Sequence, residues 1–262
     1  MKRASHDPQP SQAMTLADVT GQALVIPEFA KNDADAVALN TTFDTSDLKL
    51  PQLKICQSMT PQRKRTNEKF IEGLEEGVYF NDLTGEIYGP TVRVTLLKRW
   101  TTFINQKPLD QGGGIICRSP GACPFPCPKA EWPADGSKPA CTKFWNYLFY
   151  LPDHDDVLWF SVKSTALKPM KFYHSTLRFK HVAAVGDFAK ITVFSTEPAT
   201  NAADQEYYIP TTPSSGVSGI IGDPVLYAKL KNLTRVYAAK SIDTTRAEVP
   251  SEDNPLDDDL PM

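Results

Sequence analysis

The chain has 262 residues, of which 41% are hydrophobic and 10% aromatic, enough for a sizeable core in one large domain or two small ones. No apolar run is long enough to span a bilayer and the polar N-terminus lacks the apolar centre of a secretory signal, which favours a cytoplasmic protein with reduced cysteines. The formal net charge of −3 combines −5 in the last twelve residues, −4 in the first 48 and about +6 between them, a pattern typical of a polyanion-binding body with acidic ends.

Three regions follow from these shifts in composition. Residues 1–47 predict a loosely ordered N-terminal arm, residues 48–246 a folded domain, and residues 247–262 an acidic C-terminal tail. Within the domain, alternating apolar residues and turn signals predict extended structure at 48–56, 78–89, 91–105, 143–152, 157–164 and 188–212. Apolar residues at helical spacing predict helices at 164–181 and 224–242, the second with Val225, Leu226, Leu230, Leu233 and Tyr237 near one stripe.

A cysteine-rich insert, residues 112–142, interrupts the strands. Its four cysteines, Cys117, Cys123, Cys127 and Cys141, are separated by five, three and thirteen residues among prolines and glycines. Such a segment cannot build a hydrophobic core and needs a staple. A structural Zn²⁺ held by four thiolates suits a reducing compartment, and two disulfides or free thiols are the alternatives. Cys56 lies in an apolar run and is expected to be a small core residue.

The order of strands and helices resembles an OB-fold-like β-barrel, so we expect a mainly β protein with a few helices and a zinc-ribbon-like insertion. Such barrels bind single strands by stacking aromatic side chains on bases and tracking phosphates with cations. Aromatic and basic residues interleave in this way here, although any one of these aromatics can equally belong to the core. The predicted contacts to single-stranded DNA are Lys98, Arg99, Trp100, Phe103, Lys143, Trp145, Tyr147, Trp159, Lys163, Lys168, Lys171 and Arg178.

No enzyme signature is present in the sequence. It lacks GxSxG, HExxH, Walker and zinc-deaminase motifs, and a zinc site made of four cysteines leaves no open position for water. We therefore expect a binding protein rather than an enzyme. The alternative to DNA binding is a protein–protein interaction or structural module that carries a structural zinc and is indifferent to nucleic acid.

Two parts of the sequence resemble known families. The ending NPLDDDLPM is similar to the acidic tip of bacterial single-stranded DNA-binding proteins, with Met262 in place of their terminal aromatic. The segments LPQLKICQSMTPQRKR, FIEGLEEGVYFNDLTGEIYG and STALKP, with the insert, resemble phage-encoded single-stranded DNA-binding proteins over residues 48–212. A zinc ribbon inserted in an OB barrel also resembles one DNA-binding domain of eukaryotic replication protein A.

The resemblance implies a function. It implies a protein that coats single-stranded DNA in phage replication and recombination, without sequence preference, in the cytoplasm of a bacterial host. The tip implies recruitment of replication and recombination proteins, because an apolar end fits a partner's pocket while acidic residues meet its basic rim. The tail residues concerned are Asp257, Asp258, Asp259, Leu260, Pro261 and Met262.

Overall fold

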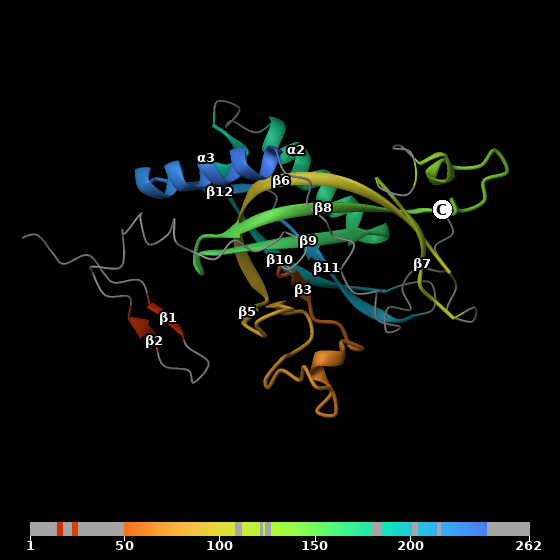
Figure 1. Ribbon diagram of the computed structural model, residues 1–262, viewed down its shortest axis with the longest axis horizontal. Coiled ribbons are helices and arrows are strands. Elements are labelled where there is room, and N and C mark those ends of the chain that lie inside the picture. The colour runs from red at the N-terminus through yellow and green to blue at the C-terminus, as the bar shows by residue number, and fades with distance from the viewer. Residues whose placement is uncertain are drawn as a thin grey trace, which may run out of the picture. The chain divides into compact units, whose positions relative to one another are not determined.

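The computed structural model describes residues 15–17, 23–25, 50–107, 112–120, 123, 127–179, 185–200, 204–213 and 216–239 (Figure 1). The chain divides into two units, Met1–Leu48 and Lys49–Met262. In the first unit, strands β1 (Thr15–Ala17) and β2 (Ala23–Val25) pair antiparallel. The remainder of the predicted N-terminal arm and the whole acidic tail lie outside the described residues, so the predicted domain boundaries stay predictions.

The second unit is built on a curved antiparallel sheet. Its strands are β6 (Thr91–Gln106), β8 (Thr142–Leu151), β9 (Asp156–Lys163), β10 (Lys190–Thr200) and β11 (Glu206–Thr211), in the order β11-β10-β6-β8-β9. Two short strands, β7 (Ile115–Ser119) and β12 (Val217–Ile220), pair with β6 and β10 respectively. Figure 1 shows β6, β8 and β9 side by side as a curled layer.

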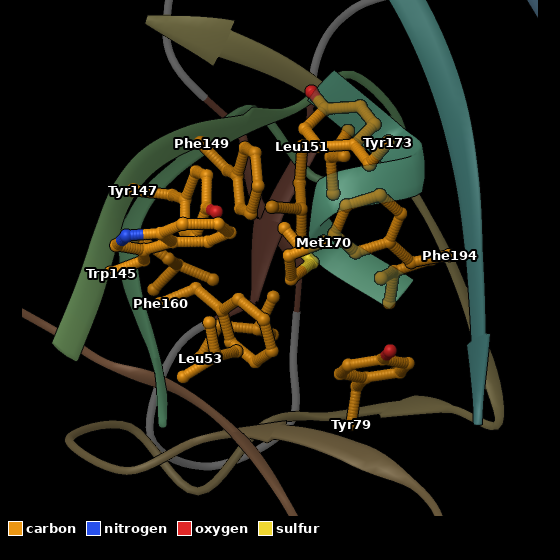
Figure 2. Packing of buried hydrophobic residues seen from close by; sticks show 14 of the residues in the cluster. Leu53, Tyr79, Trp145, Tyr147, Phe149, Leu151, Phe160, Met170, Tyr173 and Phe194 are labelled. Carbon is orange, nitrogen blue, oxygen red and sulfur yellow. The ribbon is translucent and has the colours of Figure 1, made fainter. Parts of the chain in front are cut away.

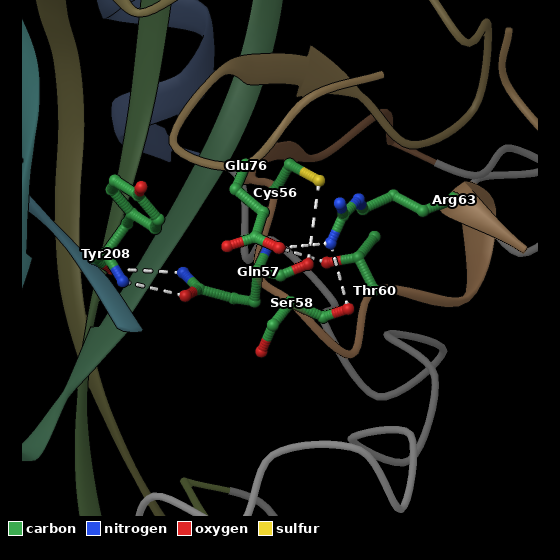
Figure 3. Close-up of polar contacts among 7 residues, drawn as sticks. All are labelled: Cys56, Gln57, Ser58, Thr60, Arg63, Glu76 and Tyr208. Atoms are coloured by element: carbon green, nitrogen blue, oxygen red, sulfur yellow. Dashed lines mark hydrogen bonds and ion pairs between the residues drawn. The ribbon is translucent and has the colours of Figure 1, made fainter. Parts of the chain in front are cut away.

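A small sheet joins the two edges of this curled layer. It consists of β3 (Leu53–Ile55), β4 (Tyr79–Asn81) and β5 (Ile87–Gly89). On one side, the Trp159 N–H of β9 donates to the Pro51 carbonyl at 3.0 Å. On the other side, the Gln57 side chain exchanges two hydrogen bonds with the backbone of Tyr208 in β11, at 3.0 and 2.8 Å (Figure 3). The segment around β3 therefore bridges both edge strands and closes the sheet toward a barrel.

Two helices cover opposite faces of β8, because successive residues of a strand point to opposite sides. Helix α2 (Leu167–Phe179) places Tyr173 and Met170 against Tyr147 and Phe149 in the main core, which Figure 2 shows. Helix α3 (Pro224–Ala239) places Leu230 in a second cluster, which contains the alternate β8 residues Leu148 and Tyr150. The remaining helical turns in the described residues are 3-10 turns at Pro61–Arg63, Pro128–Ala130, Ser164–Ala166 and Asp187–Ala189.

The predicted fold class is confirmed: the described chain is mainly β with two α-helices and an OB-like curled sheet. The predicted hairpins and both helices are present, whereas β7 and β12 fall in segments for which no strand was predicted. The stripe predicted for α3 was wrong at Val225, which is 76% exposed while Leu230 is fully buried. No helix in the part of the chain described here combines the length and apolar character needed to cross a membrane.

Candidate nucleic-acid interface

Strands β6 and β8 bring cations and aromatic rings together on the inner face of the curled sheet. The register places Arg99 opposite Tyr147 and Phe103 opposite Lys143, after a bulge at Leu97 in β6. Directly opposed residues point to the same face, so Arg99, Phe103, Lys143 and Trp145 share one side. The bulge inserts one extra residue into β6. After it, odd-numbered residues such as Arg99 and Phe103 point to the face that even-numbered residues occupy before it.

Both cations lie over aromatic rings. The guanidinium carbon of Arg99 is 4.8 Å from the centre of the Trp145 ring, and Lys143 Nζ lies 5.4 Å from the same centre. Lys143 Nζ is also 6.0 Å from the centre of the Phe103 ring. Arg99 and Lys143 are exposed, whereas Trp145 keeps only 7% of its surface accessible. The Trp145 ring therefore holds the two cations at the surface by cation–π contact.

Helix α2 supplies His174 to the same place. Its ring centre is 4.9 Å from that of Trp145, and its Nε2 lies 2.8 Å from the hydroxyl of Tyr147. Burial and, to a smaller extent, the positive charge of Arg99 together lower the pKa of His174 to about 4. The imidazole is therefore neutral at pH 7. Burial also raises the pKa of Tyr147, so that side chain keeps its proton.

Two further cations of α2 flank His174. Lys171 precedes it by three residues and Arg178 follows it by four, and these spacings place side chains on one side of a helix. Both are exposed, whereas Met170 and Leu177 face the core. We name Arg99, Phe103, Lys143, Trp145, Lys171, His174 and Arg178 the cationic seam.

Other residues predicted to contact DNA lie on the outer face of the sheet. Lys98, Trp100, Trp159 and Lys163 alternate with the seam residues along their strands or pair with residues that do. Lys98 Nζ donates to the Tyr237 carbonyl of α3 at 2.7 Å, and Lys163 Nζ lies 5.7 Å from the Phe144 ring centre. Trp100 and Trp159 belong to the cluster beneath α3.

Burial makes two more of the residues predicted to contact DNA unsuitable for stacking on bases. Tyr147 is fully buried and Trp159 is 7% exposed, so neither offers a ring face to a base. Lys168 is exposed on α2 but lies away from His174, with Ser175, on the side opposite the core. Of the residues predicted from sequence, Arg99, Phe103, Lys143 and Trp145 share one face of the sheet, with Tyr147 buried beside them. Lys171 and Arg178 flank His174 on α2, and Lys98, Trp100, Trp159, Lys163 and Lys168 lie elsewhere.

Sequence reasoning did not include His174 of α2, because its neighbours Trp145, Tyr147 and Arg99 come from strands β8 and β6. Nor did it find a buried polar chain on the outer face, where the Asn146 amide donates to Thr102 Oγ1 at 3.0 Å and accepts from Ser161 Oγ at 2.8 Å. The available signal was Asn146 itself, a polar residue within the aromatic run of β8, because a buried amide needs hydrogen-bonding partners.

The loop that follows β3, residues 60–70, is basic, and its Arg63 has a structural role. Its guanidinium contacts a Glu76 carboxylate oxygen at 2.5 Å and donates to the Ser58 carbonyl at 3.0 Å (Figure 3). Nearby, burial raises the pKa of the Cys56 thiol to about 11, and Cys56 is completely buried, as expected for a core cysteine. Arg63 is therefore engaged in holding this loop together.

The cysteine insert begins with β7, which pairs with the end of β6 opposite Phe103, Ile104 and Asn105. Its last cysteine, Cys141, directly precedes β8. The Sγ atoms of Cys127 and Cys141 are 3.6 Å apart, and all five cysteines are free thiols in this structure. The predicted partner-binding residues 257–262 lie outside the described residues.

Fold and seam together define an OB-like β protein with a cysteine-rich insert and a cation-lined inner face. The chain matches the Pam3 phage gp34-like protein family over residues 19–243, and it belongs to that family of bacteriophage proteins. No curated protein and no solved structure matches it.

Proposed function

We propose that this phage protein binds single-stranded DNA through the cationic seam and is not an enzyme. The observation that carries the proposal is the pair of exposed cations, Arg99 and Lys143, stacked over Trp145 on the inner face of an OB-like sheet. Barrels of this type bind single strands along a positively charged groove with aromatic support. The charge of about +6 in residues 49–250 supports the same class of ligand.

The cationic seam is proposed to make two kinds of contact with DNA, one with phosphates and one with bases. In this proposal Lys143, Lys171 and Arg178 contact phosphates, since their side chains are exposed and carry the positive charge that a phosphate backbone attracts. Arg99 has one face against Trp145, so its opposite face is available as a plane on which a base can stack. Trp145 is therefore a positioning residue, and the half-buried Phe103 is the aromatic side chain that can meet a base directly.

The test is a titration of the full chain with fluorescently labelled oligo-dT across a range of salt concentrations. Each phosphate contact to a single strand contributes a slope of about 0.7 in the plot of log affinity against log salt. We expect Lys143→Ala and Arg99→Ala each to weaken binding about 5- to 50-fold. Lys143→Ala should also reduce the slope by about 0.7, because it removes a phosphate contact.

Arg93→Ala is the matched control. Arg93 is an exposed arginine of the same strand β6, paired with Asp153 at 2.8 Å and distant in register from the seam. We expect its loss to leave affinity within twofold of the unmodified chain. Absence of oligo-dT binding at low salt would rule out the proposal and favour the protein–protein interaction module.

The biological setting belongs to the same proposal. A sequence-independent DNA coat in phage replication or recombination acts in the cytoplasm of the bacterial host. The tail, with its three consecutive aspartates and apolar end, is proposed to recruit replication and recombination proteins. A pull-down of host replication proteins with the full chain, compared with a chain ending at residue 253, tests the recruitment separately from DNA binding.

A further inference from the structure

We propose that Cys117, Cys123, Cys127 and Cys141 bind one structural Zn²⁺ ion as a closed four-thiolate site. Metal content is measured without DNA, so this test and the oligo-dT titration can fail separately. Three observations carry the inference: the burial pattern of the insert, the distances among the thiols and the backbone hydrogen bonds that hold the cysteines in pairs.

The described part of the insert buries little except cysteine. Among its described residues, 112–120, 123 and 127–141, only Ser119, Cys127 and Cys141 are buried. Of these described residues, the apolar Ile116 and Trp132 are 53% and 59% exposed. A segment of this length without an apolar core needs a covalent or metal staple to hold a defined conformation. The four cysteine thiols can provide this staple.

The distances fit thiolates on one metal ion. Two sulfurs bound to a tetrahedral zinc at about 2.3 Å are about 3.8 Å apart, and Cys127 Sγ lies 3.6 Å from Cys141 Sγ. A disulfide requires about 2.05 Å. The thiol of Cys123 also neighbours the thiols of Cys117 and Cys127. All four thiols therefore belong to one cluster.

The four cysteines lie near one another but do not form a complete tetrahedral coordination shell. No three His, Cys, Asp or Glu side chains in the described residues stand in a ready metal-binding arrangement. Cys127 and Cys141 are buried, whereas Cys117 and Cys123 are partly exposed. Zinc binding thus requires the outer pair to close onto the inner pair, a movement of side chains in a segment with few packing contacts.

The backbone holds the cysteines as two pairs. In the first, the Cys123 N–H donates to the Arg118 carbonyl at 3.4 Å, next to Cys117. In the second, the Cys141 N–H donates to the Lys129 carbonyl at 3.2 Å, and the Ala130 N–H donates to the Cys127 carbonyl at 2.9 Å. Two pairs of thiolates held in this way would supply the four ligands of a ribbon-type zinc site.

The position of the site explains why the fold would carry it. Cys117 lies in β7 opposite Asn105, and Cys141 precedes Thr142, which pairs with Ile104 on the other side of β6. A shared ion would therefore tie β7 to β8 across the end of β6. Lys143 of the cationic seam follows Cys141 by two residues. Zinc would in this way fix the end of the seam without contacting DNA.

The test measures metal content of the full chain by inductively coupled plasma mass spectrometry, after purification without chelator. We expect about one zinc per chain. Cys127→Ser and Cys141→Ser should each reduce it at least fivefold, and Cys56→Ser, which removes a buried cysteine outside the insert, should leave it unchanged. Replacement by Co²⁺ should give the visible absorption of a tetrahedral thiolate site, a readout that does not depend on DNA binding.

Even if a cysteine variant misfolds, measurements on the unmodified chain alone test the proposal. Metal-free protein whose four insert thiols react freely with a thiol reagent would overturn the proposal. Metal-free protein with a mass about 4 Da lower than the reduced chain would overturn it in favour of two disulfides. Iron at one per chain would overturn the assignment to zinc, since tetrahedral sulfur sites also accept iron.

Discussion

At the scale of single residues, His174 is a neutral imidazole held between a cation and a phenol. Arg99 can only donate hydrogen bonds, so the Tyr147 oxygen is the acceptor in the contact between them. The Tyr147 hydroxyl proton is then free to donate to His174 Nε2 at 2.8 Å, which leaves the imidazole proton on Nδ1. Protonation of His174 would reverse this hydrogen bond, because Nε2–H would then have to donate to a Tyr147 oxygen that already accepts from Arg99.

This arrangement predicts an acid-sensitive stability. The folded-state pKa of His174 is lowered to about 4 from 6.5, so the unfolded chain binds a proton between these values that the folded chain does not. The stabilisation is complete above pH 6.5 and is lost as the pH falls through 4. Because the ring is partly exposed and solvent screens its charge, we expect a loss of about 1–2 kcal/mol. Urea unfolding at pH 7 and pH 4.5 measures it.

His174→Gln isolates this contribution. A glutamine oxygen can still accept from Tyr147 but does not titrate, so the variant should lose about 1–2 kcal/mol less than the unmodified chain over the same pH interval. His154→Gln, in the exposed turn beside Glu86, is the control and should not remove the difference. An equal pH dependence in the unmodified chain and His174→Gln would contradict the assignment.

At the scale of elements, β12 joins α2 through a glycine that has no room for a side chain. Gly216 has a φ of +74°, and a Cβ at this position would lie 2.3 Å from Thr176 Cβ. Thr176 is itself buried in α2, where its hydroxyl donates to the Tyr173 carbonyl at 2.8 Å. The close approach of the two backbones therefore fixes how β12 begins and where α2 packs.

Gly216→Ala should consequently destabilise the fold by about 2–4 kcal/mol, the sum of backbone strain and overpacking. Gly73→Ala is the matched control: Gly73 has a φ of +76°, but no atom lies within 4 Å of its added Cβ. That variant pays only the backbone term, about 1 kcal/mol. Thermal unfolding of the two variants separates the terms, and equal destabilisation would show that the contact with Thr176 is relieved at little cost.

The strands that were predicted from the sequence and those that were not differ in how strongly their local sequence favours extended structure. β8 and β9 are long aromatic and β-branched runs bounded by a turn, so periodicity alone identifies the hairpin. β12 lies in a Gly/Ser-rich segment and β7 in the cysteine insert, where pairing with β10 and β6 overrides weak local preference. Val225 was predicted for the helical stripe of α3, but in this first turn Leu226 and Tyr227 pack against the second cluster, and Val225 stays exposed.

At the scale of the whole molecule, the sequence indicated that cations and aromatic rings come together, but not which of them do. Interleaved cations and aromatics indicated a binding face, yet strand alternation and the bulge at Leu97 send Lys98 outward and place Arg99 on the inner face. Trp145 was predicted as a contact and instead lies beneath the cations that it supports. Sequence specifies which residues are present, whereas register across β6, β8 and α2 decides which of them meet.

The distribution of charge over the whole chain leads to a prediction about the tail. Removing residues 251–262 deletes five acidic residues and no base, which changes the formal net charge from −3 to +2. An acidic segment tethered to a cationic surface competes with DNA phosphates at a high effective concentration. The truncated chain should therefore bind oligo-dT about 2- to 10-fold more tightly at low salt, with the difference shrinking as salt screens the charges. A full-length chain with Asp257, Asp258 and Asp259 replaced by Asn separates charge from length. It should reproduce more than half of the gain, and a truncation that weakens binding would show that the tail contributes to the DNA contact instead of opposing it.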